Sequence, residues 1–125
     1  MESKHNFNIG DFEIIQRYDN GYFSADYLCF QFNRENGSNK RPFEFLRNNA
    51  TIKRMAYMRR TPEFKTDRDY FHYDTGLWLH PGLLYIFICW LGDDKLEMDF
   101  WQWFLSHNKH KINKLFNLKS NDHGH

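Results

Sequence analysis

The chain has 125 residues, a length typical of one domain. Hydrophobic residues make up 41% and aromatic residues 19%, which is enough bulky apolar material for a packed core and excludes a disordered chain. Its start is polar, and its longest apolar stretch, 83–91, is too short to cross a bilayer. We therefore expect a soluble, intracellular protein with no membrane partner.

The formal net charge of +1 hides an uneven distribution. Residues 1–37 carry three basic and six acidic side chains, residues 38–72 carry nine and four, and residues 73–125 carry five and six. The middle third therefore has a charge of nine minus four, or +5. Clustered Lys and Arg can bind phosphate groups whatever the average charge of a protein. Charge alone, however, favours the plainer interpretation of a solvated helix face.

The first elements predicted along the chain are a β-hairpin and a helix. Residues 12–17 have the pattern of a short strand, and the sequence Asp-Asn-Gly at 19–21 favours a tight turn before a second strand at 22–23. Ser24 can cap a helix over 25–32. The apolar stripe of this helix consists of Leu28, Cys29 and Phe32.

Two further helices are predicted in the basic middle third. Pro42 suits the first turn of one, and Thr51 can cap the other, over 52–60. The residues expected to pack inward from the first are Phe43 and Leu46, with Phe45 left open. On the second, helical spacing places Ile52, Met55 and Ala56 on one side and Lys53, Arg54, Tyr57 and Arg60 on the other.

The second half of the chain begins with another predicted hairpin, made of strands at 70–73 and 77–79 around a Gly-containing turn. Residues 81–91 are almost wholly apolar, which is typical of a buried central helix, and Gly92 can end it.

The last predicted helix follows directly. Asp94 and Glu97 favour a capping box for a helix that reaches His107. Its apolar positions are Leu96, Phe100, Trp103 and Phe104. We expect one or two more turns within 109–118 and frayed residues at 120–125.

Two motifs in this order resemble the KilA-N domain family: GYFSADYLC at 21–29 and TGLWLHPGLLYIFICWL at 75–91. The matching residues are Gly21, Tyr22, Ala25, Leu28, Cys29, Gly76, Trp78, His80 and Pro81. The resemblance covers about residues 12–105. It implies a DNA-binding domain that is similar to the fungal APSES type and winged helix-turn-helix-like. It also implies a viral or phage origin, with a location in the host cytoplasm or nucleus.

Three departures from the family pattern stand out. Ser24 replaces the usual Asn, which keeps a capping side chain. Asp26-Tyr27 replaces the usual Thr-Asp order, and the segment 61–74 has fewer glycines than APSES-type wings.

Together these features predict an α+β fold. We expect a single domain over 12–118 with four to five helices and two short β-hairpins, winged helix-turn-helix-like, between a flexible segment at 1–11 and a flexible tail at 119–125.

The expected function is binding of DNA, with the duplex favoured. The helix at about 51–60 is expected to enter the major groove, and the hairpin at about 65–80 to contact an adjacent groove or backbone. The expected contact residues are Lys40, Arg41, Arg47, Asn48, Lys53, Arg54, Tyr57, Arg60, Lys65, Arg68 and His72. Among them, Arg41, Arg47 and Asn48 are the expected phosphate contacts. The alternatives are a self-association module without nucleic-acid binding and a binder of single strands, and a homodimer is left open.

No motif indicates an enzyme, a cofactor or a small-molecule substrate. Glu63-Phe64-Lys65 has the acidic-x-Lys form of some metal-dependent nucleases, but the same form recurs at 2–4 and 93–95. Phosphate-binding loops, HExxH and GxSxG are absent from the sequence. His80 is expected to brace the start of the buried helix.

The cysteines and the remaining histidines do not indicate a metal site either. Cys29 and Cys89 lie in apolar segments without a CxxC or CxxH partner, so we expect two core residues. His107 and His110 are only two ligands, short of a tetrahedral set.

Overall fold

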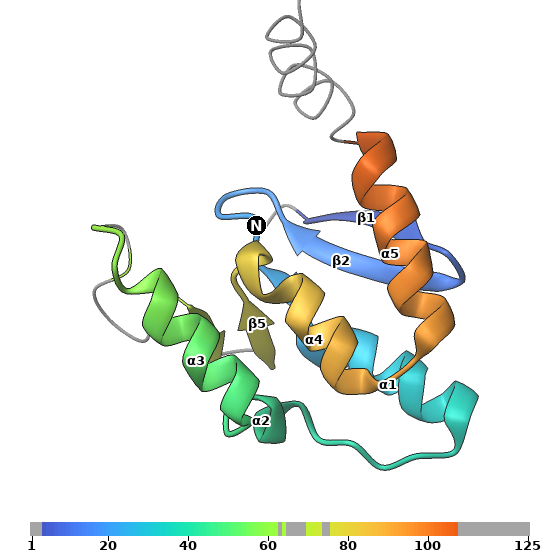
Figure 1. Ribbon diagram of the computed structural model, residues 1–125. Coiled ribbons are helices and arrows are strands. Elements are labelled where there is room, and N and C mark those ends of the chain that lie inside the picture. The colour runs from blue at the N-terminus through green and yellow to red at the C-terminus, as the bar shows by residue number, and fades with distance from the viewer. Residues whose placement is uncertain (1–3, 63, 65–69, 74–75, 108–125) are drawn as a thin grey trace, which may run out of the picture.

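The computed structural model describes residues 4–62, 64, 70–73 and 76–107. It is an α+β domain in which helices pack against an antiparallel sheet of order β1-β2-β3-β5-β4 (Figure 1). The strands are β1 (Lys4–Ile9), β2 (Phe12–Arg17), β3 (Phe23–Ser24), β4 (Phe71–Tyr73) and β5 (Leu77–Leu79). The helices are α1 (Ala25–Asn36), α2 (Pro42–Phe45), α3 (Asn49–Met58), α4 (Leu84–Leu91) and α5 (Asp94–His107). A 3₁₀ turn at Pro81–Leu83 leads into α4.

Both predicted hairpins are confirmed, and they belong to one sheet. β2 pairs with β3, β4 pairs with β5, and β3 joins the two hairpins because Phe23 lies opposite Leu79. Hydrogen bonds between Arg17 and both Gly21 and Tyr22 close the first turn, where Gly21 has a φ of +78°.

β1 corrects the expectation that residues 1–11 are a flexible segment. Residues 4–9 pair with β2 through six residue pairs. Only His5, Phe7 and Ile9 are covered, and Phe7 stacks on Trp103 with ring centroids 5.1 Å apart. His5 and the asparagines between the covered residues hide this strand pattern in the sequence.

α1 begins as predicted and runs further. The Ser24 hydroxyl accepts a hydrogen bond from the Tyr27 amide at 3.1 Å, which confirms the predicted cap. The helix continues four residues past the predicted end at Phe32 and stops at Gly37, where φ is +61°. Glycine takes this left-handed conformation without the steric cost that other residues meet.

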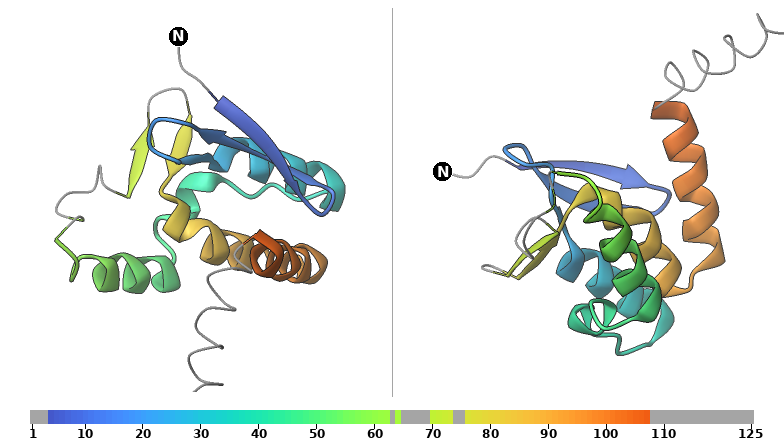
Figure 2. Two further views of the ribbon diagram at one scale, coloured as in Figure 1. Left: turned by 90° about the horizontal axis from the view of Figure 1, so that it is seen from above. Right: turned by 60° about the vertical axis from the view of Figure 1, so that its left-hand side comes forward.

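α4 is the centre of the core. It contributes Leu84, Phe87, Ile88 and Leu91 as buried residues and ends at Gly92, as predicted. α3, α4 and α5 lie side by side in a row with α4 in the middle (Figure 2, left). One side of α4 is open, however, so Cys89 is exposed and the prediction of a second core cysteine is wrong.

Two predictions about individual side chains of α2 and α5 are also wrong. α2 is a single turn, and only Phe45 is fully buried, whereas Phe43 is 44% exposed. The carboxylate that caps α5 belongs to Asp93, which accepts a hydrogen bond from the Leu96 amide at 3.1 Å, and not to Asp94.

Trp78 is buried as predicted, with 4% of its surface exposed, but on the side of the sheet away from α4. Its neighbours Leu77 and Leu79 belong to the core cluster, whereas its own ring lies under the Arg17 guanidinium at 4.1 Å from the ring centroid. None of the helices in the described part of the chain has the length and apolar character that crossing a bilayer requires. The predictions for 109–118 and 119–125 lie outside the described residues.

Candidate nucleic-acid interface

α3 carries basic and aromatic side chains on its outer side. Lys53, Arg54 and Tyr57 are exposed, as predicted, and so is Arg60 in the turn that follows the helix. The helix begins at Asn49 and ends at Met58, which corrects the predicted bounds of 52–60. The Arg60 guanidinium lies 5.4 Å from the centroid of the Tyr57 ring. Between residues 40 and 61 the sequence has seven basic side chains and one acidic side chain, Glu44. This part of the surface is therefore strongly positive, although the whole chain has a net charge of only +1.

The inner side of α3 differs from the prediction. Thr51 and Met58 are buried and Met55 is partly buried, whereas Ile52 is 50% exposed and Ala56 is exposed. Asn48, and not Thr51, caps the helix: its side-chain oxygen accepts a hydrogen bond from the Ala50 amide at 2.9 Å. α3 lies at the edge of the domain and packs on it through Thr51, Met55 and Met58. The rest of the helix surface, Ile52 included, therefore stays exposed.

The end of α3 is attached to the hairpin of β4 and β5. The Arg59 side chain donates a hydrogen bond from Nε to the Tyr70 hydroxyl at 3.2 Å, and its guanidinium lies 5.5 Å from the centroid of the Tyr70 ring. Tyr70 is fully buried and immediately precedes β4. The helix and the hairpin therefore share an anchor that sequence reasoning missed.

Two further contacts hold the hairpin in place. The Asp26 carboxylate on the first turn of α1 accepts a hydrogen bond from the Leu77 amide at 3.1 Å. Phe43 on α2 contacts Tyr73 on β4, with ring centroids 4.6 Å apart. Asp26 and Leu77 are 51 positions apart in the sequence, and no local pattern could have indicated their contact.

The predicted contact residues fall into three groups. Arg41 and Arg47 are exposed, one before α2 and one after it. His72 is partly buried and stacks on Tyr22 at 4.8 Å. Lys65 and Arg68 lie outside the described residues.

Lys40 and Asn48 have structural partners. The Lys40 ammonium group donates to the Trp90 carbonyl at 3.0 Å and lies 4.5 Å from the centroid of that ring. It thus sits at the C-terminal end of α4, where a cation is favoured by the exposed carbonyl groups. The Asn48 side chain is engaged in the cap of α3.

His80 and Cys29, whose side chains are of types that can act in catalysis, have structural roles here. His80 accepts a hydrogen bond from the Gly82 amide at 2.9 Å through Nδ1 and so braces the turn before α4, as predicted. Burial raises the pKa of the Cys29 thiol to about 11, so it stays protonated at neutral pH. Its Sγ donates to the Lys40 carbonyl at 3.3 Å. A thiol in this state is a poor nucleophile.

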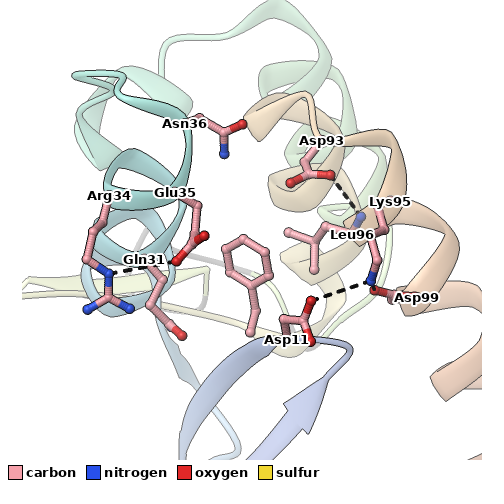
Figure 3. A pocket seen from close by; sticks show the side chains of 10 residues that line it. Asp11, Gln31, Arg34, Glu35, Asn36, Asp93, Lys95, Leu96 and Asp99 are labelled. Atoms are coloured by element: carbon pink, nitrogen blue, oxygen red, sulfur yellow. Dashed lines mark hydrogen bonds and ion pairs between the residues drawn. The ribbon is translucent and has the colours of Figure 1, made fainter.

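A polar pocket of about 490 Å³ lies between the C-terminal half of α1, the β1–β2 turn and the start of α5 (Figure 3). The Lys95 ammonium group is 2.8 Å from the Asp99 carboxylate and 3.7 Å from that of Asp11. The other charged residues that line it are Arg34, Glu35 and Asp93. Within the described part of the chain, no cluster of three or more His, Cys, Asp or Glu side chains could hold a metal ion. The carboxylates outnumber the cations here, so this region repels phosphate.

These features define a small α+β domain with a basic helix on one side and an acidic region on the other. The model of the KilA-N domain matches residues 7–110, and the chain belongs to the KilA-N domain family. This family is one of DNA-binding domains and not of enzymes. Neither the curated proteins nor the solved structures contain a match to this chain.

Proposed function

We propose that this protein binds double-stranded DNA, with the outer side of α3 in the major groove and the β4–β5 hairpin against the adjacent sugar-phosphate backbone of the DNA. One observation carries the proposal. Lys53 and Arg54 are exposed on a helix that has no acidic residue, Arg60 is exposed in the turn directly after it, and no carboxylate pairs with Lys53 or Arg54 among the described residues. An α-helix about 10–12 Å across fits a major groove about 12 Å wide.

The order of the elements supports a winged helix-turn-helix arrangement. α2 is followed by residues 46–48 and then by α3, and the β4–β5 hairpin comes next in the chain. In such domains the second helix reads base edges while the preceding element contacts the backbone. We accordingly assign base contacts to Lys53, Arg54, Tyr57 and Arg60, and phosphate contacts to Arg41 and Arg47.

The distribution of charge supports the same orientation. α5 lies on the opposite side of α4 from α3 (Figures 1 and 2). Its first turns and the residue before them carry four acidic side chains and one basic side chain, between 93 and 99. A polyanion approaching the domain is attracted to the side of α3 and repelled from the side of α5, which aligns the protein before contact.

The exposed aromatic residues favour a duplex over a single strand. Proteins that bind single strands offer aromatic faces on which unpaired bases stack. Here Phe43 and Tyr73 contact each other, and Arg60 lies over Tyr57. These rings already contact other side chains of the protein, which leaves less of their faces for unpaired bases to stack on.

The test is the combined change of Lys53, Arg54 and Arg60 to Gln. We expect loss of DNA binding with the fold intact, because surface changes usually alter stability by less than about 0.5 kcal/mol each. If all three residues contact phosphates, the slope of log affinity against log salt concentration falls by about three units, and by less if one reads a base. Binding to random and selected duplexes at several salt concentrations measures this.

Arg34 supplies a matched control. It is an exposed arginine on α1, beside the polar pocket and away from α3. We expect Arg34→Gln to leave the affinity for DNA and its dependence on salt concentration unchanged. Arg54→Gln should lower the affinity and reduce the salt dependence. If the folded triple variant binds with wild-type affinity and slope, the outer side of α3 is only a solvated surface and the proposal is wrong.

A further inference from the structure

The buried residues of α3 define which of its side chains point most directly away from the domain. Thr51 and Met58 are buried, and helical spacing puts them within about 20° of each other around the helix axis. The residues of α3 on the opposite side are Asn49, Lys53 and Ala56, and all three are exposed. The centre of the outer side is therefore an amide, a cation and a methyl group, and not a row of charges alone.

The amide of Asn49 has no structural task that explains it. The cap of α3 is already made by Asn48, whose side-chain oxygen accepts a hydrogen bond from the Ala50 amide. Within the part of the chain that the structure describes, the Asn49 side chain is exposed and makes no hydrogen bond. Asparagine is also a weaker helix former than alanine or lysine. Neither capping nor helix propensity therefore accounts for an asparagine in the first turn.

Ile52 is the apolar neighbour of this amide. It follows Asn49 by three residues, which places the two Cβ atoms about 5–6 Å apart on the helix surface. Half of the Ile52 side chain is exposed, although an isoleucine is more often buried. An exposed amide and an exposed aliphatic group thus lie together at the start of α3.

These two groups match the major-groove edges of adenine and thymine. An asparagine amide donates and accepts hydrogen bonds, and adenine offers the N7 acceptor and the N6 donor side by side. Guanine offers two acceptors at the same place, which suits Lys or Arg instead. The C5-methyl group of thymine is the apolar group that an aliphatic side chain can contact in this groove. In helix-turn-helix domains, the N-terminal residues of the second helix are the ones that contact base edges.

We propose that the first half of α3 selects A·T base pairs: Asn49 binds the major-groove edge of an adenine, and Ile52 contacts the methyl group of a nearby thymine. This inference rests on the proposed function, because it requires α3 to lie in the major groove. It adds two residues that read bases and names the base pairs that they select.

The first test uses the duplexes that the wild-type protein selects from a pool with a randomised centre. We expect adenine to be selected at one position. Asn49→Ala should lower the affinity for the selected duplexes by roughly 5- to 150-fold and relax the preference for adenine at that position. Replacing this adenine with 7-deazaadenine, which lacks the N7 acceptor, should weaken binding of the wild type but not of Asn49→Ala.

Asn8→Ala is the matched control, because Asn8 is also an exposed asparagine but lies on β1. It should bind the selected duplexes with wild-type affinity and respond to 7-deazaadenine as the wild type does. Circular dichroism should show that both variants are folded, since both side chains are at the surface.

The second test replaces each selected thymine in turn with uracil, which lacks the methyl group. At one position this change should weaken binding of the wild type roughly fourfold, the effect of uncovering one methyl group. Ile52→Ala should be insensitive to the same change. If Ile52→Ala responds to uracil as the wild type does, the thymine contact is wrong.

The outcomes separate this inference from the proposed function. If the wild-type protein does not bind duplexes, both are wrong. If the wild type binds and the triple Gln variant of α3 does not, then α3 contacts DNA. In that case the inference alone is wrong if selection yields no preferred adenine, or if Asn49→Ala keeps the adenine preference of the wild type.

Discussion

Trp78 illustrates how a single residue can be essential to the fold without belonging to the main core. It is 4% exposed, and its ring lies under the Arg17 guanidinium. We predict that Trp78→Ala lowers the free energy of unfolding by about 3–5 kcal/mol, because it removes a large buried side chain and uncovers Arg17. Urea denaturation measures the loss. Tyr57→Ala, at a position 61% exposed, is the control and should cost less than about 0.5 kcal/mol. Equal losses would contradict the packing described here.

Sequence patterns were sufficient to predict features that depend on residues close together in the chain. Ser24 as a cap, the buried Leu28 and the turn-bracing role of His80 all followed from neighbouring residues. The choice between Phe43 and Phe45 did not, because α2 is a single turn and too short for an apolar period to be visible. What each ring contacts is decided by elements distant in the chain.

At the level of elements, the outer side of α3 was predicted correctly and its inner side was not. Charged residues remain exposed under almost any packing, so the exposure of Lys53, Arg54 and Arg60 could be predicted from sequence alone. Which residues are buried depends on what the helix touches. α3 packs through Thr51 and Met58 at the edge of the domain, so apolar Ile52 is left outside and polar Thr51 is buried.

The β4–β5 hairpin depends on a glycine at its turn. Gly76 has a φ of +107°, and a Cβ atom there would overlap the Asp26 carboxylate that binds the Leu77 amide. We predict that Gly76→Ala destabilises the protein more than Gly37→Ala does. Gly37 also has a positive φ, +61°, but no atom lies within 4 Å of the added methyl group. The free energy of unfolding of the Gly37 variant should therefore fall by only about 1–2 kcal/mol, the cost of backbone strain. Chemical denaturation of both variants compares them, and equal losses would show that the hairpin moves freely away from α1.

The organisation of the whole molecule was the part that sequence patterns predicted least. The motifs at 21–29 and 75–91 carried the family resemblance, and the structure explains their coupling: β3 pairs with β5, and Asp26 binds Leu77. The joining of two hairpins into one sheet, and the addition of β1 at its edge, rest on pairings between residues far apart in sequence. Such pairings have no local signal. Charge, by contrast, is additive along the chain, so the basic middle third could be recognised at once.

α3 and α5 lie on opposite sides of the molecule, because α4 separates them (Figures 1 and 2). Substitutions more than about 10 Å apart without shared partners usually act independently. We therefore predict that Leu105→Glu, a change at an exposed position of α5, binds DNA with wild-type affinity. Fluorescence anisotropy of a labelled duplex containing one site measures the affinity, and circular dichroism checks that the variant is folded. Loss of DNA binding in folded Leu105→Glu would show instead that α5 takes part in the DNA interface.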